Sequence, residues 1–208
     1  MKHVSIMAAL LLLCALGCQT GGEKVLFADD FSELSDEWTW LREDPGDWRI
    51  RNGALEIRAR PGDANTVRNA LLRPVPGAGD GALAFEVTVT FTETPTEQYE
   101  QAGLTWYHDG EPEFKIVHEL VDDEIVIIPG RVPTDSDTVR LRLVVDGNRY
   151  TAQFREEGET EYRTVDEGEL AVGSNDHISI QCYHGPEDAD HWMRFTGFRI
   201  VRLPRDDA

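Results

Sequence analysis

Polar and charged side chains alternate with apolar ones along residues 101–128, which read QAGLTWYHDGEPEFKIVHELVDDEIVII. Successive residues of a strand point to opposite sides of a sheet, so Gln101, Thr105 and Tyr107 should share one face. Beyond the turn at 108–112, Lys115 and Glu119 fall on that same side. Amides, charged groups and an aromatic ring on one face can bind a small polar molecule. A face that is merely hydrated would show the same alternation.

Aromatic residues elsewhere in the chain extend this candidate surface. Aromatic rings stack on the C–H faces of sugars, and neighbouring carboxylates, amides and guanidinium groups hydrogen-bond to the hydroxyls. Most rings in a β-sandwich fill the core instead, and the sequence leaves open which of them do so. The residues that we expect to contact a ligand are Trp40, Arg42, Glu43, Gln101, Tyr107, Lys115, His118 and Glu119.

Acidic residues are numerous, but their spacing predicts no catalytic residue. Glycoside hydrolysis needs two carboxyl groups at a defined separation across one bond. A Glu-x-Asp-x-Glu strand pattern is absent from the sequence, and the consecutive acids Asp122, Asp123 and Glu124 point to alternating sides, as turn residues do. A hydrolytic site built from distant strands stays open.

Two further groups of residues could bind a metal ion. Asp29 and Asp30 end a predicted strand and could offer oxygens to a structural Ca²⁺, or could simply be solvated turn residues. The loop 184–191 carries two histidines and three acids, but it lacks zinc-site spacing. No cofactor is otherwise expected.

Charge and cysteine content exclude some classes of function. The formal net charge is −19, from 20 basic and 39 acidic residues, which disfavours nucleic acid and anionic lipid surfaces as partners. Cys14 and Cys18 lie in the N-terminal segment, so Cys182 is left alone and no disulfide can form inside the folded domain. A buried free thiol is the expected state of Cys182.

The N-terminus has the features of an export signal. Residues 1–17 contain a short basic start and an apolar stretch too short to span a bilayer. The sequence Ala-Leu-Gly-Cys at 15–18 resembles a permuted bacterial lipobox, which implies lipid on Cys18, a tether at 18–23 and an envelope protein anchored on the outer membrane or periplasmic side. Secretion without lipid is the alternative.

Short alternating segments separated by turn residues predict an all-β protein. The apolar pattern has a period of two, and Asn52-Gly53 between two such segments indicates a hairpin. We therefore expect one two-sheet antiparallel jelly-roll sandwich over 24–203, followed by a tail at 204–208. The predicted strands are 24–28, 38–42, 48–51, 54–58, 70–73, 83–92, 101–107, 113–120, 125–128, 139–146, 149–156, 177–183 and 192–203.

Several segments recur in an order that resembles a known family. They are Asp30-Phe31, Trp38-x-Trp40-x-Arg42-Glu43, the hairpin from Trp48 to Ile57, and Glu100-Gln101-Ala102-Gly103-Leu104-x-x-Tyr107. This series resembles the concanavalin A-like domain at the C-terminus of family 43 β-xylosidases and the related DUF1349 proteins. A weaker likeness is to DUF1080 domains, some of which are linked to cleavage of 3-keto-sugars.

The resemblance implies a concanavalin A-like jelly roll whose curved sheet faces a carbohydrate. It does not imply hydrolysis, because the catalytic carboxylates of those xylosidases belong to a separate domain. We therefore expect an exported lipoprotein that binds glycan without cutting it and touches the membrane only through its lipid. A glycan-active enzyme and an envelope protein-interaction domain are the alternatives. The glycan and the oligomeric state stay open.

Overall fold

The computed structural model describes residues 22–77 and 81–204. The expected signal peptide at 1–17, the lipidation site Cys18, most of the tether at 18–23 and most of the tail at 204–208 lie outside these residues. Within the described residues, the chain forms strands, turns and irregular connections. None of its segments there forms a helix with the length and hydropathy needed to cross a bilayer.

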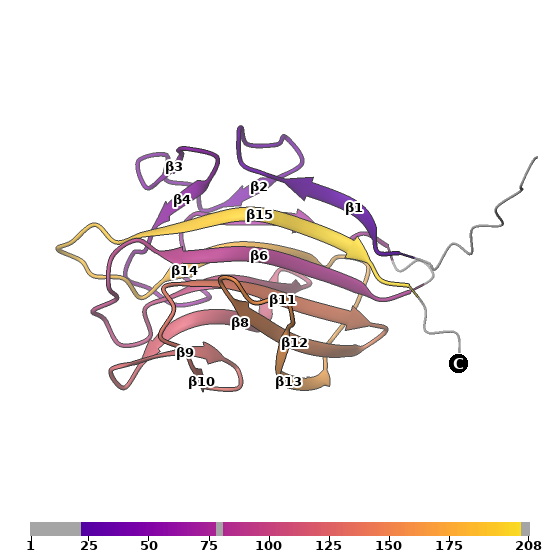
Figure 1. The fold of residues 1–208 in the computed structure, drawn as a ribbon. Coiled ribbons are helices and arrows are strands. Elements are labelled where there is room, and N and C mark those ends of the chain that lie inside the picture. Colours follow the sequence, from indigo (N-terminus) through magenta and orange to yellow (C-terminus); the bar gives the residue numbers. More distant parts are fainter. Residues whose placement is uncertain (1–21, 78–80, 205–208) are drawn as a thin grey trace, which may run out of the picture.

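In residues 22–77 and 81–204, fifteen strands form two antiparallel sheets that stack face to face, which confirms the predicted all-β sandwich (Figure 1). Sheet A has the order β13 (Arg163–Glu169), β12 (Arg149–Glu156), β11 (Thr138–Asp146), β6 (Leu83–Phe91), β15 (Trp192–Arg202), β4 (Leu55–Arg58) and β3 (Trp48–Ile50), with β1 (Lys24–Asp29) also paired to β15. Sheet B has the order β10 (Val132–Pro133), β9 (Glu124–Ile128), β8 (Glu111–Val121), β7 (Gln101–His108), β14 (His177–Tyr183), β5 (Ala70–Pro74) and β2 (Thr39–Leu41).

Tight turns set the register of the hairpins. Asn52 and Gly53 both have positive φ values, 52° and 65°, as a type I′ turn requires, and they pair Ile50 with Leu55. Asp109 and Gly110, at φ 49° and 88°, make the corresponding turn between β7 and β8. These turns place each alternating segment with its apolar residues toward the opposite sheet.

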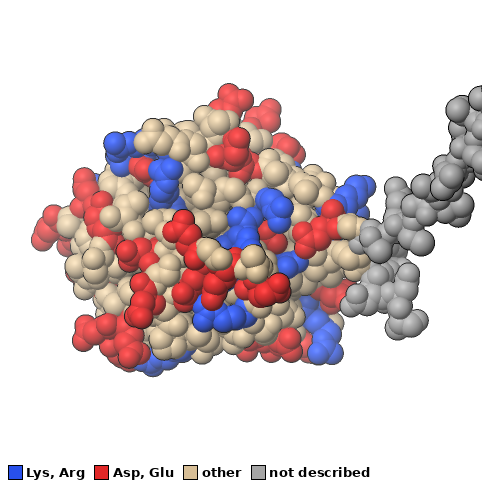
Figure 2. All heavy atoms as spheres, viewed as in Figure 1, with Lys and Arg blue, Asp and Glu red and all other residues tan. Residues whose placement is uncertain are grey.

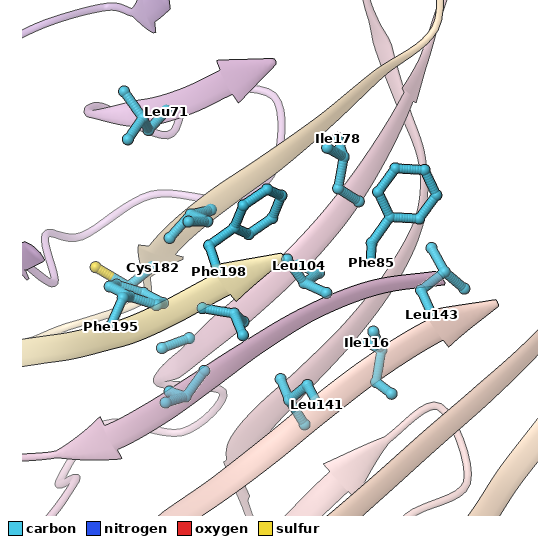
Figure 3. Close-up of a cluster of buried hydrophobic side chains, with 14 of the residues drawn as sticks. Leu71, Phe85, Leu104, Ile116, Leu141, Leu143, Ile178, Cys182, Phe195 and Phe198 are labelled. Atoms are coloured by element: carbon cyan, nitrogen blue, oxygen red, sulfur yellow. The ribbon is translucent and has the colours of Figure 1, made fainter. Parts of the chain in front are cut away.

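The core lies between the two sheets. Figure 3 shows Phe85, Leu141 and Phe195 of sheet A meeting Leu104 and Ile116 of sheet B, and all five side chains are fully buried. Burial of this apolar surface is the main source of stability in a chain whose described residues contain no disulfide.

Cys182 lies in the same core and is a buried free thiol, as expected. Burial raises the pKa of its thiol well above the ordinary value, so the reactive thiolate is suppressed.

Candidate functional site

The register of sheet B brings the polar residues of β7 and β8 together. Gln101 pairs with Glu119, and Thr105 pairs with Lys115, on the face turned away from the core. The ammonium group of Lys115 donates to Gln101 Oε1 at 2.7 Å and to Glu119 Oε2 at 2.9 Å. Gln101 Nε2 donates to the carbonyl oxygen of Tyr99 at 2.8 Å. These bonds fix the three side chains in a single network across two strands.

A hollow of about 440 Å³ lies beside this network. We call it the sheet-B hollow. Its floor includes Gln101, Thr105, Lys115 and Glu119 from the two strands. Its rim comes from three connections and the start of β8, and comprises Asp63, Ala64, Asn65, Tyr99, Pro112, Glu113, Phe114, Tyr183 and His184. The clustering that alternation predicted for Gln101, Lys115 and Glu119 is therefore present, next to a cavity; their role in binding stays a prediction.

Three aromatic rings lie along one side of the hollow. Tyr99 is the most accessible of them, with 48% of its surface exposed. The ring centroid of His184 is 6.1 Å from that of Tyr99 and 5.3 Å from that of Tyr183. Partial burial lowers the pKa of His184 below its ordinary value, so this imidazole is neutral at pH 7. An exposed ring next to fixed hydrogen-bonding groups suits a ligand with apolar faces and polar edges.

Two buried polar groups on this face have no hydrogen-bond partner among the described residues. They are Thr105 Oγ1, which borders the hollow, and Gln181 Nε2 on the neighbouring strand β14. Gln181 Oε1, in contrast, accepts from Tyr107 and Ser179, both at 2.9 Å. Buried polar atoms are nearly always satisfied by protein, water or ligand. Of these two residues only Thr105 borders the hollow, so its hydroxyl indicates where a bound molecule could donate or accept.

Tyr107 and Arg42 lie near the hollow but do not line it. Tyr107 is only 1% exposed, and its hydroxyl is used by Gln181, so its ring offers no free surface for stacking. Burial raises the pKa of Tyr107, and the nearby charge of Arg42 partly offsets that rise. Arg42 itself donates to the carbonyl oxygen of Val67 at 3.0 Å.

Trp40 and Glu43 form a separate cluster around Trp48. Trp40 pairs with Leu71 of β5 and packs against the core, with its ring centroid 4.8 Å from that of Trp48. Glu43 accepts from Trp48 Nε1 at 3.1 Å. Neither residue lines the sheet-B hollow, so the predicted surface divides into two parts.

His118 is removed from the candidate surface. It pairs with Ala102 and points between the sheets, where it is fully buried and stacked on Phe91 at 4.2 Å between centroids. Burial lowers the pKa of His118 to about 3. The expectation that His118 contacts a ligand is therefore wrong. The period-two pattern places its side chain with those of Phe114 and Ile116, on the side opposite Lys115 and Glu119.

The two aspartates expected to bind Ca²⁺ are used within their own turn. Asp29 accepts from the backbone N–H of Phe31 and from Trp38 Nε1, both at 2.8 Å. Asp30 accepts from the backbone N–H of Ser32, and that bond holds its pKa below the usual value. No group of three or more His, Cys, Asp or Glu residues suited to a metal ion occurs among residues 22–77 and 81–204. A structural Ca²⁺ at Asp29 and Asp30 stays an untested prediction.

The rim residues were harder to find from the sequence. Asp63, Tyr99 and His184 lie in three connections far apart along the chain, and only the fold brings them together. Alternation says nothing about such loops. The one signal for Tyr99 and His184 is their position just outside β7 and β14, two strands that pair with each other.

Two stacked antiparallel sheets, with a polar hollow on the outer face of one, define a concanavalin A-like sandwich. The profile of the "Beta xylosidase C-terminal Concanavalin A-like domain" family matches residues 28–200, and the chain belongs to this family. The resemblance carried by the segments from Asp30 to Tyr107 is therefore confirmed for the xylosidase domain. The likenesses to DUF1349 and DUF1080 proteins stay predictions.

Solved structures agree on the fold. The family 43 protein BlXynB of Bacillus licheniformis is 17% identical with a TM-score of 0.68, and the match covers 85% of this chain and 39% of that one. A xylan β-1,4-xylosidase of Bacillus halodurans C-125 is also 17% identical, with a TM-score of 0.67 and coverage of 83% and 38%. This chain thus spans about two fifths of the length of either protein.

A shorter protein shares the fold over its full length. The CBM2 module of the evolved Dit protein of Lactobacillus casei BL23 phage J-1 is 9% identical, with a TM-score of 0.56 and coverage of 90% of this chain and 99% of that one. No curated protein matches the chain in sequence.

Proposed function

We propose that this domain binds a glycan in the sheet-B hollow and does not cut it. The observation that carries the proposal is the hollow itself, where the fixed polar group of Gln101, Lys115 and Glu119 adjoins the exposed ring of Tyr99. Sugars have apolar C–H faces and a rim of hydroxyls, so one ring and several hydrogen-bonding groups match both parts. The unpartnered hydroxyl of Thr105 adds a further contact for a sugar hydroxyl.

The state of the acids in the hollow favours binding over hydrolysis. A glycosidase needs one carboxyl group with a raised pKa to protonate the leaving oxygen. The hydroxyl of Thr66, with nearby backbone amides, instead holds the pKa of Asp63 below its usual value. Glu119 is paired with Lys115 at 2.9 Å.

The relatives support a carbohydrate over other ligands. One is named a family 43 protein, a second is named a xylan β-1,4-xylosidase, and a third is named a CBM2 module. Since fold alone does not determine function, the comparison supports a glycan as ligand and does not choose one.

Affinity electrophoresis on plant and bacterial polysaccharides tests the proposal. We expect retardation of the wild-type protein by at least one glycan, and about a tenfold loss of affinity in Tyr99→Ala, because a lost stacking contact weakens binding by roughly 1.5 kcal/mol. Val172→Ala is the matched control, since Val172 is also exposed, at 43%, and lies outside the sheet-B hollow.

Absence of retardation by every polysaccharide would refute glycan binding. Capture of a specific envelope protein by the same domain would then favour the protein-interaction alternative. Release of a sugar product during the assay would instead refute the non-catalytic part of the proposal.

We also propose that the protein is exported and lipid-anchored through Cys18, with the membrane as a partner only through that lipid. The support is the Ala-Leu-Gly-Cys sequence after an apolar stretch. Metabolic labelling with a radioactive fatty acid should mark the wild-type chain and not Cys18→Ser. Equal labelling of the two, or none of the wild type, would leave secretion as the better account.

A further inference from the structure

A second hollow, of about 480 Å³, lies next to the first. It is lined by residues 61–62, Glu97, Gln98 and the loop 184–189. His184 lines both hollows, so the two meet at this side chain. We call the two adjoining hollows together the groove. Each has the volume of a small-molecule site, so the groove offers more room than a single sugar needs.

The groove is acidic along its length. Asp63, Glu113 and Glu119 line the sheet-B hollow, against one cation, Lys115. The second hollow is lined by Glu97, Glu187 and Asp188, and by neither lysine nor arginine.

Among the described residues, Lys115 is the one lysine or arginine that lines the groove, and it is already paired. Lys115 is paired with Glu119 at 2.9 Å, so these two charges offset each other. Asp63 and Glu113 remain as the other acids of the sheet-B hollow. His184, between the hollows, is uncharged at pH 7 because burial lowers its pKa. The groove therefore presents carboxylates to a ligand. The chain as a whole has a net charge of −19, and Figure 2 shows acidic side chains spread among basic ones on the face formed by sheet A.

An independent observation indicates that a ligand enters this groove. Thr105 is only 2% exposed, it borders the first hollow, and its hydroxyl has no partner among the described residues. Carboxylate oxygens are available around it. Asp63 uses Oδ1 for its bonds within the turn, and Glu119 uses Oε2 for Lys115, which leaves the second oxygen of each acid for a ligand.

We infer that the groove selects a cationic glycan, a chain of amino sugars with free amines, over neutral and uronic-acid chains. The inference rests on the proposed function and names its substrate class. Protonated amines at regular intervals would meet carboxylates along both hollows, while the sugar rings contact Tyr99 and a hydroxyl reaches Thr105. A uronate chain would place like charges against these acids. A basic peptide carries similar charge, but it lacks the rigid hydroxylated rings that suit Tyr99 and Thr105.

Isothermal titration calorimetry in mildly acidic buffer tests the inference, with glucosamine oligomers, N-acetylglucosamine oligomers, xylo-oligosaccharides, oligogalacturonates and a lysine peptide. We expect the glucosamine hexamer to bind most tightly, to exceed its dimer because it reaches both hollows, and to weaken as salt is added. If a neutral, acidic or peptide probe binds as tightly as the glucosamine hexamer or more tightly, the inference is overturned. The proposal of glycan binding still stands in that case if any of the sugars binds. No binding by any sugar would overturn both.

Charge variants separate the groove from the overall charge of the protein. The double variant Glu187→Gln with Asp188→Asn alters two exposed loop acids of the second hollow, and we expect about a fivefold loss of affinity for the glucosamine hexamer. The control Glu124→Gln with Glu167→Gln makes the same change of net charge at exposed positions outside both hollows and should leave affinity unchanged. An equal loss in the two double variants would overturn the inference.

Discussion

Glu86 is a buried carboxylate on sheet A that forms ion pairs with three arginines, and its removal should destabilise the domain strongly. Its side chain is 2% exposed. Arg199 donates to Glu86 Oε2 at 2.7 Å and Arg140 at 2.9 Å, while Arg142 Nε lies 3.4 Å from Oε1. These residues come from the adjacent strands β15, β6 and β11, so one carboxylate holds the centre of the sheet together electrostatically.

The expected cost follows from what Glu86→Gln leaves behind. The amide keeps the shape of the side chain but removes its charge, so Arg140 loses its carboxylate partner. Arg142 and Arg199 then keep only the exposed Glu23, at 3.1 and 3.9 Å. Breaking a buried ion pair by changing one partner costs about 3–5 kcal/mol. At the lower figure, the melting temperature of a domain of this size should fall by about 6–12 °C.

The same group predicts a pH dependence. Burial pushes the pKa of Glu86 up, but hydrogen bonds and charge from Arg140 and Arg199 outweigh it, and the pKa lies below the ordinary value of 4.5. Because the folded-state pKa is the lower one, the stabilisation is complete above about pH 4.5 and is lost as the pH falls through the folded-state value. Glu86→Gln should therefore weaken the loss of stability in acid.

Urea unfolding followed by tryptophan fluorescence, from neutral pH to acid, measures both effects. Glu167→Gln is the control, because Glu167 is exposed on β13, and its stability should stay within about 0.5 kcal/mol of the wild type. If Glu86→Gln unfolds at the wild-type urea concentration at neutral pH, or keeps the full acid dependence, the argument for this carboxylate is refuted.

Three further predictions concern buried groups. His118→Leu should remove a pH effect, because His118 is neutral in the folded protein, with a pKa of about 3, and becomes protonated in the unfolded chain as the pH falls. The free energy of unfolding, measured with urea, should fall by about 1.4 kcal/mol more in the wild type than in the variant between about pH 7.5 and 5.5. Equal losses would contradict this. Cys182 should react with a thiol reagent only in denaturant, as located by peptide mass spectrometry, and rapid native labelling would contradict its burial. Tyr107→Phe should lower the free energy of unfolding by about 1 kcal/mol through its lost bond to Gln181 but leave glycan affinity unchanged, and an affinity loss like that of Tyr99→Ala would place Tyr107 in the site.

Strands with strict alternation were predictable almost to the residue. The expected strands 149–156 and 177–183 coincide with β12 and β14, and 83–92 differs from β6 at one end only. Their apolar side chains repeat every second residue, so burial of one face fixes both the type of structure and the register. The Asn52-Gly53 hairpin was predictable for a local reason, because these residues accept the positive φ values of its turn.

Two strands were not predicted because their own sequences are weak. β13 is RTVDEGE, an edge strand with three acids, which forms only because β12 offers a pairing edge. β10 has two residues, Val132 and Pro133, and pairs with β9. Such strands depend on a neighbour and not on an apolar pattern, so local sequence carries little signal for them.

The residues of the candidate site also fall into those that strand alternation predicts and those that depend on the surrounding loops. Gln101, Lys115 and Glu119 were predictable because period-two geometry alone puts them on one face. The same geometry was sufficient to place His118 on the other face. Whether a side chain on the right face is accessible depends on the surrounding loops, which is why Tyr107 proved buried and Tyr99 exposed.

The pairing of β1 with β15 has a practical consequence. Lys24 lies beside Arg202, so both ends of the domain leave at one place. β15 begins at Trp192, directly after the loop that lines the second hollow, and its 11 residues run roughly 30 Å to Arg202. A purification tag, a surface linker or a fused enzyme joined directly before Lys24 or after Arg202 would therefore emerge far from the groove and leave its mouth open.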